Sequence, residues 1–204
     1  MSTSTGLARA LAAVADGLRR SGLHWYVFGA QAVIAYGRPR LTADLDVTVA
    51  AAPEQVAELV ASFETAGLRL RSAPSDDFVK RTRVLPFVHE ETELPVDVVL
   101  AGPGLEEEFL AAVRELDLAG VTVPVISPED LVVTKILAGR PKDLEDVYGV
   151  LREQLPALDI ERCRRFLSLL EQALSRSDLL PELDRALSRL GNGNRRGASE
   201  KEGS

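Results

Sequence analysis

The 204-residue sequence predicts an α+β fold, a mixed β-sheet flanked by helices and followed by a helical C-terminal part. Short apolar runs bounded by turn residues alternate with helical periodicity up to residue 126, which indicates strands and helices sharing one core. From residue 128 onward only the helical periodicity remains. Hydrophobic residues make up 46% of the chain and charged residues 27%, values typical of a globular protein with a sizeable core.

Helical periodicity and helix-start signals define the predicted helices. Leu7, Leu11 and Leu18 fall on one face of the first helix, which is therefore amphipathic. Pro53 and Pro128 stand at the first position of two later helices, where proline is tolerated because its missing N–H is not needed. The predicted helices are residues 5–21, 31–36, 53–66, 105–116, 128–137, 142–155, 159–174 and 178–190.

Short runs of β-branched and aromatic residues define the predicted strands. The acidic turn 89–93 separates two of these runs, which we expect to pair as an antiparallel hairpin. The predicted strands are residues 25–28, 41–49, 79–88, 94–100 and 121–126.

The element order predicts one core domain over residues 1–155, with the helices of residues 156–190 packed on it. No linker-like segment separates the two parts. Residues 191–204 contain no apolar residue larger than alanine, so they cannot bury enough surface to become ordered, and we expect a disordered tail.

Charge and composition exclude several classes of protein. The net charge of −7 provides no global basic field for nucleic acid, so such a contact needs a local basic cluster, and for each cluster alone solvated charge is the favoured explanation. Cys163 is the only cysteine and has helical spacing with apolar neighbours, so we expect it in the core. His24 and His89 have no metal-ligand spacing, which argues against a zinc site or a Ser-His-Asp triad. We expect no membrane segment and a cytoplasmic location. The basic clusters are Arg38/Arg40, Lys80/Arg81/Arg83 and Arg162/Arg164/Arg165.

Three aspartates stand in two of the predicted strands. Asp44 and Asp46 are two residues apart, so in a strand their carboxylates project from the same face, roughly 6–7 Å apart. Asp97 is the only charged residue in the run 94–100, and the three acids converge if the two strands are neighbours. Carboxylates are the ligands that Mg²⁺ prefers, usually together with substrate phosphates, so the pattern predicts a site for two-metal phosphoryl chemistry.

The order of these motifs resembles a known family. A Gly29 turn after a strand, an Asp-x-Asp strand and a later Asp97 resemble the minimal nucleotidyltransferases of the DNA polymerase beta superfamily. The segment 40–46, Arg-x-Thr-x-Asp-x-Asp, is similar to the AbiEii-like nucleotidyltransferases of bacterial abortive-infection and toxin–antitoxin systems. So is the later pair of Lys135 and the Lys-Asp-x-x-Asp element 142–146. The resemblance covers about residues 25–151.

The resemblance implies a nucleotidyltransferase-like fold and a Mg²⁺-dependent enzyme that transfers NMP from an NTP to a tRNA or protein hydroxyl. It also implies the toxin of a toxin–antitoxin pair, with a cognate antitoxin as partner. The catalytic residues implied are Asp44, Asp46, Asp97 and Lys135, of which the three aspartates are the metal ligands. The nucleotide-binding residues implied are Gly29, Ala30, Arg40, Thr42 and Asp146.

Structural explanations of the same residues stay open. Gly29 is explained by a turn that needs a positive φ, and Asp44 and Asp46 by solvated acids on an edge strand. Lys135 is explained as an ordinary lysine on a helix surface, and Asp143 by the preference for acids in the first helical turn. Arg40 and Thr42 suit the entry to a strand as well as a phosphate contact, and Asp146 lies one turn after Asp143.

Position 30 leaves an alternative function open. Ala30 stands where the family usually has a second glycine or a serine, so a hydroxyl that could contact the nucleotide is absent. The alternative is a non-catalytic module with the same fold, which acts as an antitoxin or a nucleotide-binding partner.

Overall fold

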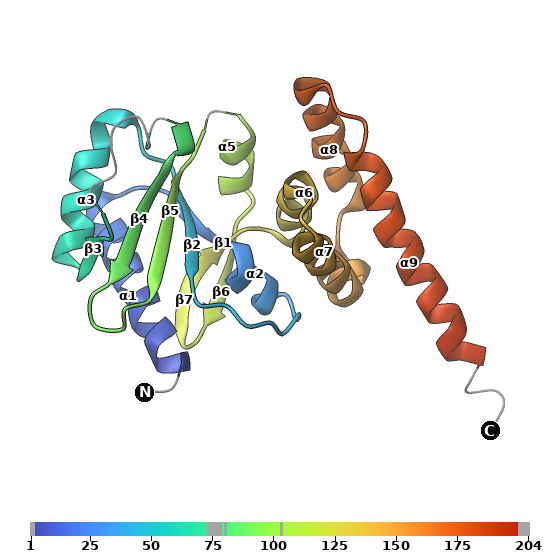
Figure 1. The fold of residues 1–204 in the computed structure, drawn as a ribbon, viewed down its shortest axis with the longest axis horizontal. Helices are drawn as coiled ribbons and strands as arrows, with labels where there is room; N and C mark the ends of the chain where they lie inside the picture. The colour runs from blue at the N-terminus through green and yellow to red at the C-terminus, as the bar shows by residue number, and fades with distance from the viewer. Residues whose placement is uncertain (1–2, 73–78, 80, 103, 200–204) are drawn as a thin grey trace. The chain divides into compact units, whose positions relative to one another are not determined.

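The computed structural model describes residues 3–72, 79, 81–102 and 104–199 (Figure 1). The chain divides into two compact units. The sheet unit comprises Met1–Ala35 and Arg40–Ser127, and the helical unit comprises Tyr36–Pro39 and Pro128–Ser204. Within the described residues, no helix has both the length and the apolar character needed to cross a bilayer.

The sheet of the sheet unit is mixed. Over the described residues its seven strands have the order β3-β4-β5-β2-β1-β7-β6. The β1–β7 and β2–β5 pairs are parallel, and the other neighbours are antiparallel, including the expected β4–β5 hairpin. The predicted mixed sheet flanked by helices is therefore confirmed. The strands are β1 (Trp25–Phe28), β2 (Leu45–Val49), β3 (Leu68–Leu70), β4 (Val84–His89), β5 (Pro95–Leu100), β6 (Arg114–Leu118) and β7 (Val121–Val125).

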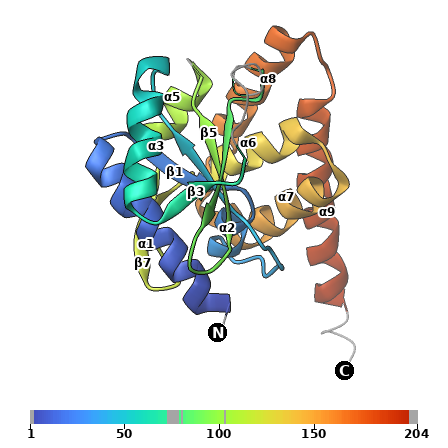
Figure 2. The ribbon, with the colours of Figure 1, turned by 60° about the vertical axis from the view of Figure 1, so that its left-hand side comes forward.

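Two helices of the sheet unit, α1 (Thr3–Ser21) and α3 (Val56–Thr65), lie side by side (Figure 2). Phe63 of α3 approaches Gly17 so closely that a Cβ on Gly17 would lie 2.6 Å from the Phe63 ring. The same ring meets Phe87 of β4 edge-on, with centroids 5.0 Å apart, and both side chains are fully buried. These contacts tie the helix pair to the sheet core. The sheet unit also contains η1 (Pro53–Gln55), α2 (Gly29–Ala35) and α5 (Leu105–Leu110).

The helical unit packs α6 against α7 and α8, and α9 against α7 and α8. Its buried residues include Leu151 of α7, Leu167 of α8 and Leu183 of α9, which fall on the inner faces of amphipathic helices. Arg189 of α9 covers the ring of Tyr148, with its guanidinium carbon 4.2 Å from the ring centroid. The elements are α6 (Pro128–Ala138), α7 (Pro141–Gln154), η2 (Leu155–Ala157), α8 (Ile160–Leu174) and α9 (Leu179–Ser199).

Several local features of the sheet unit differ from the expected elements; the predicted strand 79–88, for example, begins only at Val84. The predicted helix 105–116 ends at Leu110, and β6 begins at Arg114, because pairing with β7 overrides local helical periodicity. β2 begins at Leu45, so Asp44 precedes the strand rather than standing in it. β3 was not expected at all, since three residues are too short for a recognisable period.

The C-terminal segments also differ in extent from the expectation. Contacts group α6 and α7 with α8 and α9, whereas the sequence places residues 128–155 in the core domain. α9 extends to Ser199, past the predicted start of disorder at residue 191. Residues 200–204 of the predicted tail lie outside the described residues.

Candidate active site

Gly29 is the point where β1 ends and α2 begins, and no other residue type fits there. Its φ is +64°, a left-handed conformation that disfavours residues with a Cβ. Phe28 pairs with Asp46 across the β1–β2 ladder, which brings the Asp46 side chain against Gly29. A Cβ on Gly29 would lie 2.0 Å from Oδ2 of Asp46. The glycine is therefore required both by the backbone and by the space that this carboxylate occupies.

Asp46 and Asp97 stand directly opposite each other on the parallel strands β2 and β5. Residues paired in register share a face of the sheet, and neighbouring strands lie roughly 4.8 Å apart. Both residues are half-buried, while Leu45, Val47 and Val96 beside them are fully buried on the other face. The fold thus places two carboxylates, called the acid pair below, next to each other at a partly exposed position.

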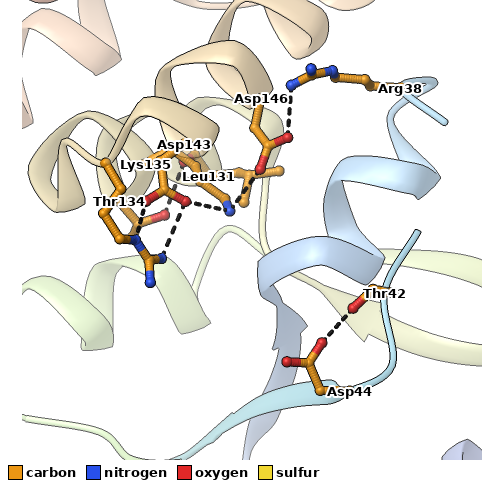
Figure 3. A network of polar contacts seen from close by, with 9 residues as sticks. Arg38, Thr42, Asp44, Leu131, Thr134, Lys135, Asp143 and Asp146 are labelled. Atoms are coloured by element: carbon orange, nitrogen blue, oxygen red, sulfur yellow. Dashed lines mark hydrogen bonds and ion pairs between the residues drawn. The ribbon is translucent and has the colours of Figure 1, made fainter. Parts of the chain in front are cut away.

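Asp44 is held by two contacts just before β2. The hydroxyl of Thr42 donates a hydrogen bond to the Asp44 carboxylate (Figure 3). The side-chain amide of Gln31, in α2, donates to the backbone carbonyl of Asp44 over 3.3 Å. Gln31 is 6% exposed, so a buried amide anchors the segment that leads to the acid pair. Nothing in the sequence pattern singled out Gln31, because its role depends on a contact across 13 positions.

Arg71 adds a cation at the acid pair that the sequence did not indicate. Its guanidinium forms an ion pair with Oδ1 of Asp97. Its backbone N–H donates to the carbonyl of Pro86 over 2.8 Å, and Pro86 is the β4 residue paired with Asp97. The 26 positions between Arg71 and Asp97 explain why no local motif reveals this contact.

The donor set at this position suits a hard divalent cation, although the described residues contain no preformed cluster. No group of three or more His, Cys, Asp or Glu residues in the described part of the chain is arranged to hold a metal ion. The acid pair supplies adjacent carboxylate oxygens, and Gly29 keeps the space beside Asp46 Oδ2 free of a side chain. Carboxylates in such a position fit Mg²⁺ chemistry. The convergence of Asp44, Asp46 and Asp97 on one ion stays a prediction.

The other predicted nucleotide-binding residues of the sheet unit flank this position. Ala30 is 6% exposed in the first turn of α2, directly after Gly29. Arg40 is half-buried and stands at the start of the stretch that leads through Thr42 to Asp44.

Lys135 and Asp146 lie in the helical unit, in a network of charges that we call the ion network (Figure 3). The ammonium group of Lys135 in α6 donates to Oδ1 of Asp143 and to Oδ2 of Asp146, each over 3.0 Å. Arg38 donates to Oδ1 of Asp146 over 2.7 Å, and Arg140 binds Asp143 through two nitrogens. Each carboxylate therefore accepts hydrogen bonds from two cations.

The centre of the ion network is almost completely removed from solvent, whereas Arg38 and Arg140 at its edge are 28% and 61% exposed. The side chains of Lys135, Asp143 and Asp146 are 9%, 0% and 4% exposed. Burial alone would raise the pKa of the Asp143 carboxyl, but hydrogen bonds from Arg140 and Lys135 outweigh it and hold the pKa below its ordinary value. The network thus keeps the Asp143 carboxylate charged inside the helical unit.

Cys163 of α8 is fully buried, as its apolar spacing predicted. Burial raises the pKa of its thiol to about 12, with further contributions from Glu129 and Asp130. Because the thiolate is the reactive form, this cysteine is chemically inert at neutral pH.

Several of the basic residues singled out in the sequence have anionic partners or carbonyl acceptors, as Arg38 does in the ion network. Arg162 binds Asp130 through two nitrogens, each over 2.9 Å, and Arg164 binds Asp184 over 2.6 Å. Arg83 donates to the carbonyl of Leu100 over 2.8 Å. Lys80 lies outside the described residues.

Solved structures with a similar fold include nucleotidyltransferases. The solution structure of the antibiotic-resistance factor ANT(2'')-Ia superposes with a TM-score of 0.57 and 18% identity, covering 84% of this chain and 92% of that chain. The crystal structure of ANT(2'')-Ia in complex with adenylyl-2''-tobramycin has a TM-score of 0.54 and 17% identity, covering 81% of this chain and 97% of that chain. A putative nucleotidyltransferase from H. pylori has a TM-score of 0.50 and 16% identity, covering 92% of this chain and 81% of that chain.

At these identities the likeness concerns the fold. A search of curated proteins finds no match to this chain. The family model described as "Nucleotidyltransferase of unknown function (DUF6036)" matches residues 9–167, which include the acid pair, the Gly29 turn and the ion network. The chain therefore belongs to this nucleotidyltransferase family.

Proposed function

We propose that the protein is a Mg²⁺-dependent nucleotidyltransferase that transfers NMP from an NTP to an acceptor hydroxyl. The observation that carries this proposal is the acid pair of Asp46 and Asp97 beside Gly29. Two like charges directly opposite each other in a sheet are unfavourable unless a cation compensates them. The fold nevertheless reserves space for the Asp46 carboxylate by placing a glycine at position 29.

In the proposed reaction, the acceptor oxygen forms a bond to the α-phosphorus of the NTP while the bond to the β-phosphate oxygen breaks and pyrophosphate leaves. Bound Mg²⁺ would supply charge neutralisation for the phosphoryl oxygens. Asp44, Asp46 and Asp97 would hold it, and Asp97 would take the proton of the acceptor hydroxyl. Thr42 would orient the Asp44 carboxylate through its hydrogen bond.

The triphosphate would be held by backbone amides rather than by a side-chain hydroxyl. Gly29 lies against the Asp46 carboxylate and Ala30 follows it, so their N–H groups would face the triphosphate, and position 30 carries only a methyl group. Arg40 would add a positive charge for a phosphate oxygen. The hydroxyl that is missing at Ala30 favours the alternative function, a non-catalytic module with the same fold.

Lys135 and Asp146 would support the reaction in one of two ways. The resemblance implies direct contact with the nucleotide or acceptor. The contacts of Lys135 favour an indirect role, since two carboxylates accept hydrogen bonds from its buried ammonium. We propose the indirect role, in which both residues hold α6 and α7 in place.

The proposed acceptor is a hydroxyl group of tRNA or protein, and the proposed partner is a cognate antitoxin. Both follow from the resemblance to AbiEii-like enzymes. A similar fold occurs in ANT(2'')-Ia, which has been crystallised with adenylyl-2''-tobramycin, so small hydroxylated molecules belong in the acceptor screen. The net charge of −7 means that an RNA acceptor depends on a local contact rather than on long-range attraction.

The test measures consumption of labelled NTP with Mg²⁺ and, in separate reactions, total tRNA, proteins or small hydroxylated molecules. We expect Asp46→Asn and Asp44→Asn to lower the rate at least about a hundredfold, because they remove the charge that holds a hard cation. Glu115→Gln is the matched control, since Glu115 is an exposed acid on the edge strand β6. It should retain the wild-type rate.

Thermal melting separates this function from the alternative. Mg²⁺ with NTP should raise the melting temperature of wild type and of Glu115→Gln, and should have little effect on Asp46→Asn. A wild type without any NTP consumption or Mg²⁺-dependent shift would contradict the proposed enzyme. A nucleotide-dependent shift without turnover by any acceptor would favour the non-catalytic module.

A further inference from the structure

Arg71 occupies one oxygen of the acid pair. Its guanidinium pairs with Oδ1 of Asp97, the residue that stands opposite Asp46. The backbone of Arg71 is fixed by its hydrogen bond to Pro86, whose own register partner is Asp97. The arginine is therefore directed at the acid pair from the end of β3, two strands away from β5.

The Arg71–Asp97 pair differs from a structural ion pair in its exposure. The side chains of Arg71 and Asp97 are 40% and 34% exposed, so water screens their attraction. Ion pairs in such positions contribute roughly 0.2–1 kcal/mol. A divalent cation that binds two carboxylates at once can displace a partner held this weakly.

We propose that Arg71 is a positioning residue that competes with the divalent cation for Asp97 and so lowers the metal affinity of the acid pair. The guanidinium compensates the Asp97 carboxylate and holds its side chain in place until a divalent ion takes Oδ1. This inference rests on the proposed function, because it assigns the acid pair to metal binding. It assigns a role to Arg71, which directly follows β3 and belongs to none of the motifs identified in the sequence.

Competition of this kind has a measurable size. Removing the guanidinium frees Oδ1 of Asp97, so the ion no longer has to displace a partner. An exposed pair worth about 0.2–1 kcal/mol corresponds to a change in affinity of up to about fivefold. We therefore expect Arg71→Gln to bind the cation about two- to fivefold more tightly than wild type.

The experiment titrates the full-length protein with Mn²⁺ and follows the signal of the free ion by electron paramagnetic resonance, without nucleotide. Arg69→Gln is the matched control, because Arg69 lies in β3 and pairs with Glu93 over 3.3 Å at an exposed position. It removes the same charge two residues before Arg71 and should leave the dissociation constant unchanged. The melting temperature of each variant, with and without Mn²⁺, gives a second readout.

The outcomes separate this inference from the function on which it rests. Tighter Mn²⁺ binding by Arg71→Gln but not by Arg69→Gln supports the inference. Measurable binding by Arg71→Gln when wild type shows none supports it as well. Equal tightening by Arg71→Gln and Arg69→Gln would reveal a general effect of net charge and overturn it. Unchanged or weaker binding by Arg71→Gln, with wild type binding Mn²⁺, would overturn the competition but leave the enzyme proposal standing. Absence of binding by every variant would overturn both.

Discussion

The acid pair of the sheet unit and the ion network of the helical unit both combine aspartates with arginine. They differ in how far cations of the protein compensate the negative charge of the aspartates. In the ion network, each of Asp143 and Asp146 accepts hydrogen bonds from two cations, and both side chains are at most 4% exposed. At the acid pair, Asp97 forms an ion pair with Arg71, whose side chain is 40% exposed. Buried carboxylates need compensation within the fold, whereas a partly exposed pair can take its compensation from a bound cation.

The largest effect on stability should come from removing the cation at the centre of the ion network. Lys135→Met keeps the length of the side chain but leaves Asp143 and Asp146 without their shared partner. Breaking a buried ion pair from one side typically costs about 3–5 kcal/mol, because a charge stays buried without compensation. We expect a loss of this size in the free energy of unfolding, measured with urea.

Two further variants show whether the cost comes from the network. Lys142→Met removes an exposed lysine from α7 and should change stability by less than about 0.5 kcal/mol. Lys135→Met combined with Asp143→Asn and Asp146→Asn should recover much of the loss, because no carboxylate charge then stays behind. If Lys135→Met has full stability but no nucleotidyl transfer, the direct catalytic role replaces the structural one.

A smaller effect on stability, together with a large effect on activity, is expected for Gly29→Ala. The left-handed backbone costs a residue with a Cβ about 1–2 kcal/mol, and the new methyl group collides with the Asp46 carboxylate. A displacement of about 1 Å at a reacting centre can cost about a hundredfold in rate. We expect a rate loss of that order in the NTP-consumption assay.

Comparison with Gly22→Ala isolates the effect of the collision between the new methyl group and Asp46 in Gly29→Ala. Gly22 has a φ of +66°, and nothing lies within 4 Å of the Cβ that alanine would add. It should show the backbone cost alone, with unchanged turnover. Equal rates for the two variants would mean that the position of the Asp46 carboxylate does not limit the reaction.

The sequence predicted the parts of both regions that depend on local pattern. The period of the strands and the Gly29 turn are local, and the β2–β5 register then placed Asp97 opposite Asp46, whereas Asp44 lies before β2 rather than in it. Gln31 and Arg71 could not be found this way, because their contacts join distant positions and their residue types are common on any surface. The partial replacement of helix 105–116 by β6 has the same origin, since strand pairing with β7 decided it.

Gly149 in α7 shows a further contact that no sequence pattern could reveal. A Cβ at this position would lie 2.1 Å from Cδ of Arg38, so the glycine makes room for the arginine that reaches Asp146. In an unobstructed helix interior, Gly→Ala stabilises by about 1 kcal/mol. We expect Gly149→Ala to give no such gain in wild type, because Arg38 must move and weaken its bond to Asp146.

A double-mutant cycle measures this coupling. Gly149→Ala introduced into Arg38→Ala should raise the free energy of unfolding by about 1 kcal/mol, since the obstructing side chain is gone. The same gain in both backgrounds would show that Arg38 does not lie across the glycine in solution.

The smallest expected effect is a dependence of stability on acid pH that originates in the ion network. The pKa of Asp143 in the folded protein is below that of the unfolded chain, because hydrogen bonds from Arg140 and Lys135 outweigh the opposing effect of burial. Below its ordinary value of about 4, the unfolded chain binds more protons than the folded protein, so lowering the pH favours unfolding. The stabilisation from this carboxyl is therefore fully present above about pH 4 and is lost as the pH falls through the folded-state pKa.

Asp143→Asn cannot take up this proton, so the stability difference between wild type and Asp143→Asn should shrink between about pH 4 and the lowest pH at which the protein folds. Urea unfolding at a series of pH values measures that difference, with Glu115→Gln as the control for an exposed acid. A difference that stays constant, or that grows on acidification, would mean that the cations of the ion network do not lower the pKa of Asp143.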